Sequence, residues 1–208
     1  MDDVSKSGMG MFQSPTIVTM TIVYDLGQTV DLEDVREGCA KFLRTGKSFM
    51  NCATLSFGKK AMKVFKNGKL HITGCRSNED ARECCETFLD QMAYDVCVDD
   101  MSHKILMMNV CVRSSGQMLD PFPQLDALQE VFDQRAEVKT RYHPDIYQGL
   151  VLKVEAGPGR VVTVLTFYTG TLMFMGVKHP AELRCVSEIV YDTFRKTMAT
   201  ATTSTPCA

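Results

Sequence analysis

The sequence predicts an α+β fold in which two related halves build one antiparallel sheet with helices on one face. Three observations predict this: an internal repeat, a strand and turn pattern in each copy, and a helix after each copy. The copies, VFKNGKLHITGCRS at residues 64–77 and TFYTGTLMFMGVKH at residues 166–179, share a Phe, two glycines and an apolar residue. Each shared residue recurs 102 positions later, as Phe65 and Phe167 show, which indicates a duplication.

Each copy predicts a strand, a tight turn, a second strand and a helix. Residues 61–65 and 161–167 are rich in strand-forming residues, and the Asn-Gly pair of FKNGK predicts a hairpin turn. Apolar residues recur every three or four positions after each copy, and this spacing predicts helices. Ser77 suits the N-cap of the first helix, and Pro180 suits the first turn of the second. The helices are expected at residues 78–92 and 180–196.

A strand, a helix and a further strand are predicted upstream of each copy. The order strand, helix, three strands, helix excludes regular βαβ crossovers, so it predicts an antiparallel sheet. Small polar residues at both ends of the chain predict disorder. The upstream elements are expected at residues 16–27, 31–43 and 49–57 in the first half and at 103–112, 124–138 and 147–154 in the second. The predicted organisation is a disordered segment at 1–14, repeats at 15–97 and 98–197, and a disordered tail at 198–208.

Composition and charge are those of an ordinary globular protein. Of 208 residues, 45% are hydrophobic and 23% charged, and the formal net charge is −2. No apolar run is long enough for a membrane span, and the acidic start lacks the pattern of a secretory signal. We therefore expect an intracellular protein with no membrane partner. Nine cysteines occur without a CxxC motif or histidines at zinc-ligand spacing, which predicts reduced thiols and no metal.

No catalytic constellation can be recognised in the sequence. We find no Ser/His/Asp arrangement and no carboxylate pair, and the four histidines are isolated from one another. The sequence therefore predicts no enzyme activity, no cofactor and no small-molecule substrate.

Three motifs resemble, in the same order, segments of the TATA-box-binding-protein family. They are VYDLGQTVDLEDV at residues 23–35, FKNGKLHITGCRS at residues 65–77 and YHPDIYQGL at residues 142–150, and the resemblance covers about residues 16–197. The resemblance implies a saddle: two pseudo-symmetric halves form one curved antiparallel sheet with helices on its convex face. It also implies a DNA-binding general transcription initiation factor that binds and bends promoter DNA from the minor groove.

The resemblance further implies partners and a location. The partners are double-stranded promoter DNA and general transcription initiation factors or the RNA polymerase machinery. The location is the nucleus, or the viral transcription site if the source is a virus rather than a divergent eukaryote.

Four aromatic residues correspond to the family's DNA wedges, because in that family each half inserts two phenylalanines between base steps. Carried over by motif, they are Phe49 and Phe65 in the first half, and Tyr147 and Phe167 in the second. An apolar wedge replaces lost base stacking with its own contacts and so holds a kink. A single aromatic residue is more often part of a core, and only the paired placement favours wedges.

Strand alternation predicts which side chains share the face of Phe65 and Phe167. An exposed sheet face with many apolar side chains is an aggregation liability unless a partner covers it. The minor groove, lined by sugar edges and a degenerate base pattern, is such a partner. The other residues predicted on this face are Ala61, Lys63, His71 and Thr73 in the first half, and Leu165, Met173 and Met175 in the second.

Charge is distributed unevenly around the first hairpin. Residues 56–78 contain no acidic residue, whereas the helix that follows them is acidic. A basic hairpin suits phosphate contacts, although each charge run could also be a solvated face. The second hairpin has chiefly Arg160 and Lys178, so the first half is expected to make more phosphate contacts. The basic residues of the first hairpin are Lys59, Lys60, Lys63, Lys66, Lys69 and Arg76.

Several positions depart from the family pattern. Thr19 and Met107 stand where the family has a central Asn pair that reads base edges, and Asn109 lies close by. A Met side chain cannot replace the donor and acceptor of Asn. Lys63 and His71 occupy positions that are aliphatic in the family. These departures predict relaxed sequence specificity. They also leave open an alternative, a protein-interaction module of the same fold with weak or lost DNA binding.

Overall fold

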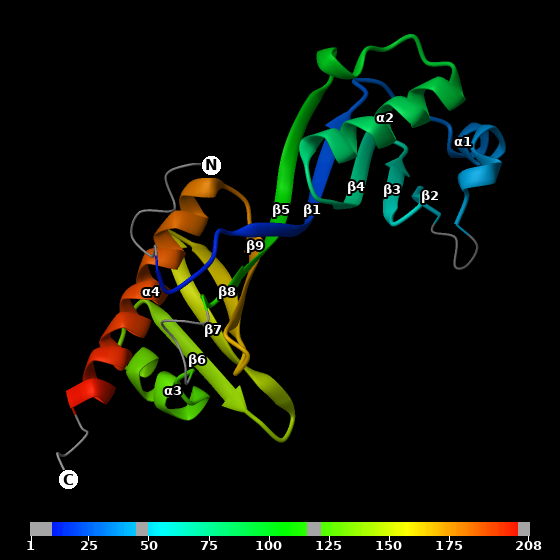
Figure 1. Ribbon diagram of the computed structural model, residues 1–208. Helices are drawn as coiled ribbons and strands as arrows, with labels where there is room; N and C mark the ends of the chain where they lie inside the picture. Colours follow the sequence, from blue (N-terminus) through cyan, green and yellow to red (C-terminus); the bar gives the residue numbers. More distant parts are fainter. Residues whose placement is uncertain (1–9, 45–49, 116–121, 204–208) are drawn as a thin grey trace. The chain divides into compact units, whose positions relative to one another are not determined.

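The structure, a computed structural model, describes residues 10–44, 50–115 and 122–203. Within these residues it has four α-helices and nine strands in one sheet, which confirms the predicted α+β class (Figure 1). The elements are, in chain order, β1 (Thr16–Asp25), α1 (Leu32–Gly38), β2 (Cys52–Phe57), β3 (Lys60–Phe65), β4 (Lys69–Cys75), α2 (Asn78–Met92), β5 (Ser102–Arg113), α3 (Leu125–Asp133), β6 (Val138–His143), β7 (Tyr147–Gly157), β8 (Arg160–Thr166), β9 (Thr171–Val177) and α4 (Pro180–Thr203).

The strands follow the order β2-β3-β4-β1-β5-β9-β8-β7-β6. The pairs β1–β4, β2–β3, β3–β4, β6–β7, β7–β8 and β8–β9 are all antiparallel, as predicted. The chain forms two compact units: the first unit is Ile17–Met108, and the second unit is Met1–Thr16 together with Asn109–Ala208. The boundary between the units falls inside β5, later in the chain than the expected boundary at residue 97.

The first unit packs α2 against one face of its strands (Figure 1). Met62, Val64, Leu70 and Ile72 alternate along β3 and β4 and are fully buried, whereas the residues between them are half-buried or exposed. This alternation defines a helix face, which carries the core, and an open face on the other side. Helix α2 spans the residues predicted for it, and the Ser77 hydroxyl caps it by accepting a hydrogen bond from the Asp80 amide at 3.1 Å.

The second unit packs α3 and α4 against β6, β7 and β9 (Figure 1). Its core includes Phe132, Phe174 and Phe194, which are fully buried. Strand β6 was not predicted, because a helix was expected over residues 124–138 and the expected helix ends early, at Asp133. Along β6, Val138, Thr140 and Tyr142 are buried or half-buried, whereas Lys139, Arg141 and His143 are exposed.

The chain ends are more ordered than the sequence predicts. Phe12 is buried in the second unit, where its ring stacks on Tyr191 with centroids 4.6 Å apart. The Gln13 amide donates to the Arg113 carbonyl at 2.7 Å. Helix α4 continues to Thr203. Residues 10–13 and the end of α4 thus have defined contacts or helical structure within the segments predicted to be disordered, and the other terminal residues lie outside the described part of the chain.

The repeated glycines share one backbone conformation. Gly68 and Gly170 have φ of 79° and 74°, and Gly74 and Gly176 have φ of 86° and 77°. Only glycine adopts this left-handed region without strain. A Cβ at Gly68 would also lie 2.0 Å from the Gln28 carbonyl oxygen. Gly68 and Gly170 lie in the hairpin turns, whereas Gly74 and Gly176 lie within β4 and β9, so the duplicated pattern records the backbone geometry of both a turn and a strand.

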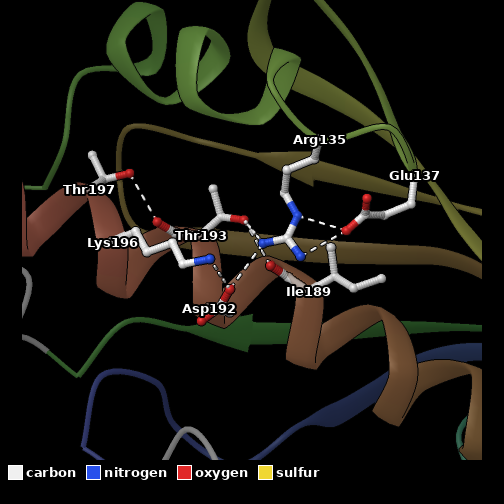
Figure 2. A network of polar contacts seen from close by, with 7 residues as sticks. All are labelled: Arg135, Glu137, Ile189, Asp192, Thr193, Lys196 and Thr197. Atoms are coloured by element: carbon white, nitrogen blue, oxygen red, sulfur yellow. Dashed lines mark hydrogen bonds and ion pairs between the residues drawn. The ribbon is translucent and has the colours of Figure 1, made fainter.

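A polar network fastens α4 to the loop between α3 and β6 (Figure 2). The Arg135 guanidinium contacts the Glu137 carboxylate at 2.7 Å and the Asp192 carboxylate at 3.0 Å. It also donates to the Thr193 hydroxyl at 3.1 Å, and Lys196 reaches Asp192 at 2.9 Å. Hydrogen bonds from Lys196 and Arg135 lower the pKa of Asp192. The network ties α4 to the loop between α3 and β6 on the helix face of the second unit.

The cysteines of the described residues are all free thiols, as expected for reduced cysteines. Five of them are buried, and burial raises the pKa of the Cys85 thiol to about 12, so this thiol behaves as a small apolar group. In the described part of the chain no helix combines the length and the apolar character needed to cross a membrane.

Candidate nucleic-acid interface

The open face of the first unit carries a polar pair beside an aromatic ring. Lys63 on β3 lies directly opposite His71 on β4, and Ala61 lies opposite Thr73. The ring of Phe65 contacts the His71 imidazole with centroids 4.7 Å apart. Phe65 is half-buried and is absent from the core. The structure thus places all five residues on one face, as alternation predicts.

Positive charge surrounds this face. Lys59 and Lys66 lie exposed in the two hairpin turns, and Lys69 lies on β4 opposite Asp25. Burial, followed by the nearby charges of Lys63, Lys69 and Lys104, lowers the pKa of His71. At neutral pH the imidazole is therefore uncharged, and the positive charge of the hairpin comes from its lysines.

Lys60 does not join this group, because it lies on the helix face. Its ammonium contacts the Asp80 carboxylate at 2.7 Å and the Glu83 carboxylate at 3.4 Å. The hydrogen bond from Lys60 lowers the pKa of Asp80, and a further hydrogen bond from the Arg76 amide acts in the same direction. As a neighbour of Lys59 in the sequence, Lys60 was predicted to bind DNA, but alternation along β3 turns it toward α2.

The open face of the second unit is more apolar. Leu165 lies opposite Met173, and Thr163 lies opposite Met175. Met175 is 36% exposed, and Leu165 and Met173 are half-buried. Long apolar side chains therefore remain accessible along this face, which is the property expected of a surface that a partner covers.

Two aromatic rings project together at the end of this face. The rings of Tyr147 and Phe167 lie edge to face with centroids 6.1 Å apart, and Tyr147 is 40% exposed. Gly149 lies directly beneath them: a Cβ on it would be 2.7 Å from the Tyr147 ring and 3.0 Å from the Phe167 ring. The glycine therefore provides the room in which the two rings sit side by side.

A basic cluster in the second unit was missed by sequence reasoning. Lys139 on β6 lies directly opposite Lys153 on β7, and Arg141 follows two residues later on the same face. All three side chains are exposed. Like charges directly opposite each other on a sheet are destabilising, so this arrangement suits a surface that an anion covers. Alternation of charge along residues 138–143 was the signal that could have revealed it.

Arg160, by contrast, is held on the helix face of the second unit. Its guanidinium contacts the Glu182 carboxylate at 2.8 Å, and the Lys178 amide donates to the same carboxylate at 2.8 Å. The hydrogen bond from Arg160, the largest cause, lowers the pKa of Glu182 to about 2. The basic side chains of this open face thus come from β6 and β7, and Arg160 does not contribute to it.

Comparison with known proteins finds similarity to TATA-box-binding proteins over most of the chain. The family model for transcription factor TFIID, or TATA-binding protein, matches residues 14–94. A TATA-box-binding protein of Methanocaldococcus jannaschii is 23% identical over 181 residues, which are 86% of this chain and 93% of that protein. TATA-box-binding protein 2 of Entamoeba histolytica is 25% identical over 178 residues, with 85% of this chain and 79% of that protein covered.

A solved structure supports the same relationship at the level of the fold. The Methanococcus jannaschii TBP matches with a TM-score of 0.69 at 21% sequence identity, over 89% of this chain and 99% of that one. The chain is thus similar in sequence and in fold to TATA-box-binding proteins. The family model ends at residue 94, inside the first unit, while the relatives named above span both units.

The positions of the TATA-box-binding-protein Asn pair are filled differently here. Thr19 is half-buried on β1, and Met107 is exposed on β5. Asn109 lies on the same face of β5 as Met107, and its Oδ1 accepts a hydrogen bond from the Gly176 amide at 3.1 Å. This bond fixes the carboxamide orientation and leaves its NH₂ group as the part that can donate to a ligand.

The first unit lacks a described counterpart of the Tyr147 ring. Phe49, which was predicted as a wedge, lies outside the described residues. Cys52 pairs with Phe65, and Gly149 continues the pairing of β7 toward Phe167, so Cys52 and Gly149 occupy equivalent places. Two residues earlier, Met50 is 95% exposed. Met50 lies in the turn before β2, so the strand pairing assigns neither Met50 nor Phe49 to the position of Tyr147.

Proposed function

We propose that the chain is a DNA-binding transcription initiation factor that binds the minor groove of promoter DNA with the open faces of both units. One observation carries this proposal. Each open face combines a half-buried aromatic ring at its hairpin, Phe65 or Phe167, with lysines on neighbouring strands or turns. Aromatic wedges with flanking positive charge are what kinking DNA from the minor groove requires, because the wedge replaces stacking and the lysines neutralise phosphates.

In this proposal Phe49, Phe65, Tyr147 and Phe167 wedge between base steps. Lys59, Lys63, Lys66 and Lys69 contact phosphates from the first unit, with Lys139, Arg141 and Lys153 doing so from the second. Lys60 is left out because its ammonium is paired with Asp80.

Specificity is proposed to be relaxed relative to the TATA-box-binding proteins. Thr19 and Met107 offer less hydrogen bonding than an Asn pair, and Asn109 has already committed its carbonyl oxygen. Two lost contacts of this kind are worth about 1–3 kcal/mol each in base discrimination. The deformability of the site would then decide binding, with pyrimidine–purine steps favoured because they kink most easily.

The helix faces are proposed to contact transcription initiation factors or the polymerase machinery. The proposed place of action is the nucleus, or the site of viral transcription for a viral source. An exposed acidic surface on α2, which includes Glu79, Glu83 and Asp90, favours a second candidate function, a protein-interaction module that binds DNA weakly or not at all.

The test is a binding and bending measurement on one set of duplexes. Fluorescence transfer between dyes at the two duplex ends reports bending, and anisotropy at several salt concentrations reports affinity. We expect bending together with an affinity that falls steeply with salt. A chain that is folded but neither binds nor bends any duplex would instead be the protein-interaction module.

A further inference from the structure

The two units differ at one equivalent pair of positions beside the wedge. In the first unit the cross-strand pair is Lys63 and His71. In the second unit, 102 residues later in both strands, it is Leu165 and Met173. The His71 ring contacts the Phe65 ring with centroids 4.7 Å apart, so it lies next to whatever step Phe65 enters.

The chemistry of the minor groove makes this difference consequential. Its floor offers acceptors at every base pair, and only guanine adds a donor, the N2 amine. A Leu and Met surface offers that amine only the weak acceptor of the Met thioether, so the amine would lose its water without an adequate replacement partner. A neutral imidazole has one nitrogen with a lone pair that can accept the bond. Burial and the surrounding lysines lower the pKa of His71, which keeps the ring neutral at pH 7.

We propose that His71 is a specificity-determining residue that lets the first unit accept a G·C pair next to the step wedged by Phe65. The second unit, with Met173 in the equivalent place, requires an A·T pair there. The recognition element is therefore asymmetric, with one half tolerant of G·C and the other half restricted to A·T. This inference rests on the proposed function.

The experiment compares duplexes that differ in one amine. Starting from an A·T-rich duplex that the protein binds, a G·C pair is placed next to the kinked step in one half or the other. In matched duplexes inosine replaces guanine, which removes only the N2 amine. With the G·C pair in one half, the affinity of the wild-type protein should stay within about twofold of its affinity for the parent duplex. With the G·C pair in the other half, the affinity should be about tenfold lower. Inosine should restore binding in the restricted half.

Variants identify which unit reads which half. His71→Met should make both halves restricted, whereas His71→Gln, which keeps an acceptor, should leave the tolerant half tolerant. The matched variant Met173→His should make both halves tolerant. Thermal unfolding of each variant checks that it is folded, and Met173→His decides the matter if the His71→Met variant does not fold.

Each outcome separates this inference from the proposed function. Equal penalties in both halves for the wild type, or a penalty that inosine does not relieve, would overturn the role of His71 while leaving DNA binding intact. Failure to bind any duplex would overturn the proposed function and this inference with it.

Discussion

The two units keep the same backbone devices but present different surfaces. Gly68, Gly74, Gly170 and Gly176 all adopt left-handed φ values. On the open faces, by contrast, the first unit carries the polar pair Lys63 and His71, and the second unit carries the apolar pair Leu165 and Met173 at the equivalent positions. The left-handed glycines cannot be replaced without disturbing the backbone of the hairpin. Core packing constrains a side chain on the open face much less. At this pair of positions the two copies have diverged in side-chain chemistry while their glycines have kept the same backbone conformation.

Positive charge is also supplied differently in the two units. In the first unit it comes from the hairpin itself, through Lys59, Lys63 and Lys66. In the second unit it comes from β6 and β7, where Lys139 faces Lys153. The expectation that the first unit makes more phosphate contacts depended on the hairpins alone. The structure offers both units a set of basic side chains on the open face.

The largest expected effect is on the wedges. Phe65→Ala and Phe167→Ala should strongly reduce DNA bending, yet each should cost well under the roughly 3–5 kcal/mol of a buried Phe, because both rings are half-buried. Matched controls are Phe88→Ala in the first unit and Phe174→Ala in the second, whose rings are fully buried. Fluorescence transfer and thermal unfolding measure the two quantities.

The comparison of units sharpens this prediction. If only Phe167→Ala abolishes bending, the kink belongs to the second unit, where Tyr147 supports the ring. A loss of stability for Phe65→Ala as large as that for Phe88→Ala would instead mean that Phe65 is a core residue, and the wedge assignment would fail.

A smaller effect is expected from the two sets of lysines. Replacing Lys139 and Lys153 by Gln, or Lys59 and Lys66 by Gln, should reduce the salt dependence of binding, with a slope change of about 0.9 per lost phosphate contact. The Lys139 and Lys153 changes should also raise stability slightly, because they remove a like-charge pair across two strands. Salt titrations by anisotropy provide the measurement.

Lys60→Gln is the matched control for the lysines. It should leave the salt slope unchanged and lower stability, since its ammonium is paired with Asp80 on the helix face. If the salt slope falls for Lys60→Gln but not when the open-face lysines are replaced, the DNA must bind the helix face of the sheet and not the open face.

An ion pair recurs at the same place in both units, and it predicts a pH dependence. Lys60 at the start of β3 pairs with Asp80 in the first turn of α2, and Arg160 at the start of β8 pairs with Glu182 in the first turn of α4. The pKa of Glu182 is lowered from 4.5 to about 2. Its contribution to stability is thus present above pH 4.5 and is lost as the pH falls toward 2.

Glu182→Gln should therefore lower the Tm at pH 7 by a few degrees and weaken the acid dependence between pH 4.5 and 2. Thermal unfolding across this pH range is the measurement. Asp80→Asn is the corresponding change in the first unit, where the pKa is also lowered. An acid dependence identical to that of the wild type would mean that Glu182 gains nothing from Arg160 in the folded chain.

Much of the fold followed from the sequence, because its signals were local. The Ser77 cap and the period of α2 fixed that helix, and the four glycines fixed the hairpins. The errors came from non-local packing. Phe12 does not belong to a periodic apolar pattern. Its ring is buried against the ring of Tyr191, which is far away in the sequence.

The candidate site shows the same limit. Alternation placed Lys63, His71 and Met173 on one face with their neighbours, since it depends only on the strand. Charge clustering in the sequence grouped Lys60 with the DNA-facing lysines, whereas alternation along β3 places it on the helix face, where it pairs with Asp80. Alternation along residues 138–143 could have placed Lys139 and Arg141 on one face, but the pairing of Lys139 with Lys153 also needed the register of β6 against β7.

The smallest expected effect lies in the core, at equivalent positions of the two units. Val64 in the first unit and Thr166 in the second are both fully buried on the helix face. Within the described part of the chain the Thr166 Oγ1 has no hydrogen-bond partner. A buried hydroxyl without a partner is costly, and Val has nearly the same shape, so Thr166→Val should stabilise the protein by about 1 kcal/mol.

Val64→Thr is the mirror change, and it should destabilise by about 1–3 kcal/mol, because it places in the first unit the unpaired hydroxyl that the second already carries. Neither change touches the open face, so both variants should bind duplex DNA as the wild type does. Chemical denaturation compares the free energies of unfolding. Destabilisation by Thr166→Val would show that this hydroxyl does find a hydrogen-bond partner, such as a bound water molecule. The threonine would then stabilise the second unit at a position where the first unit has the apolar side chain of Val64.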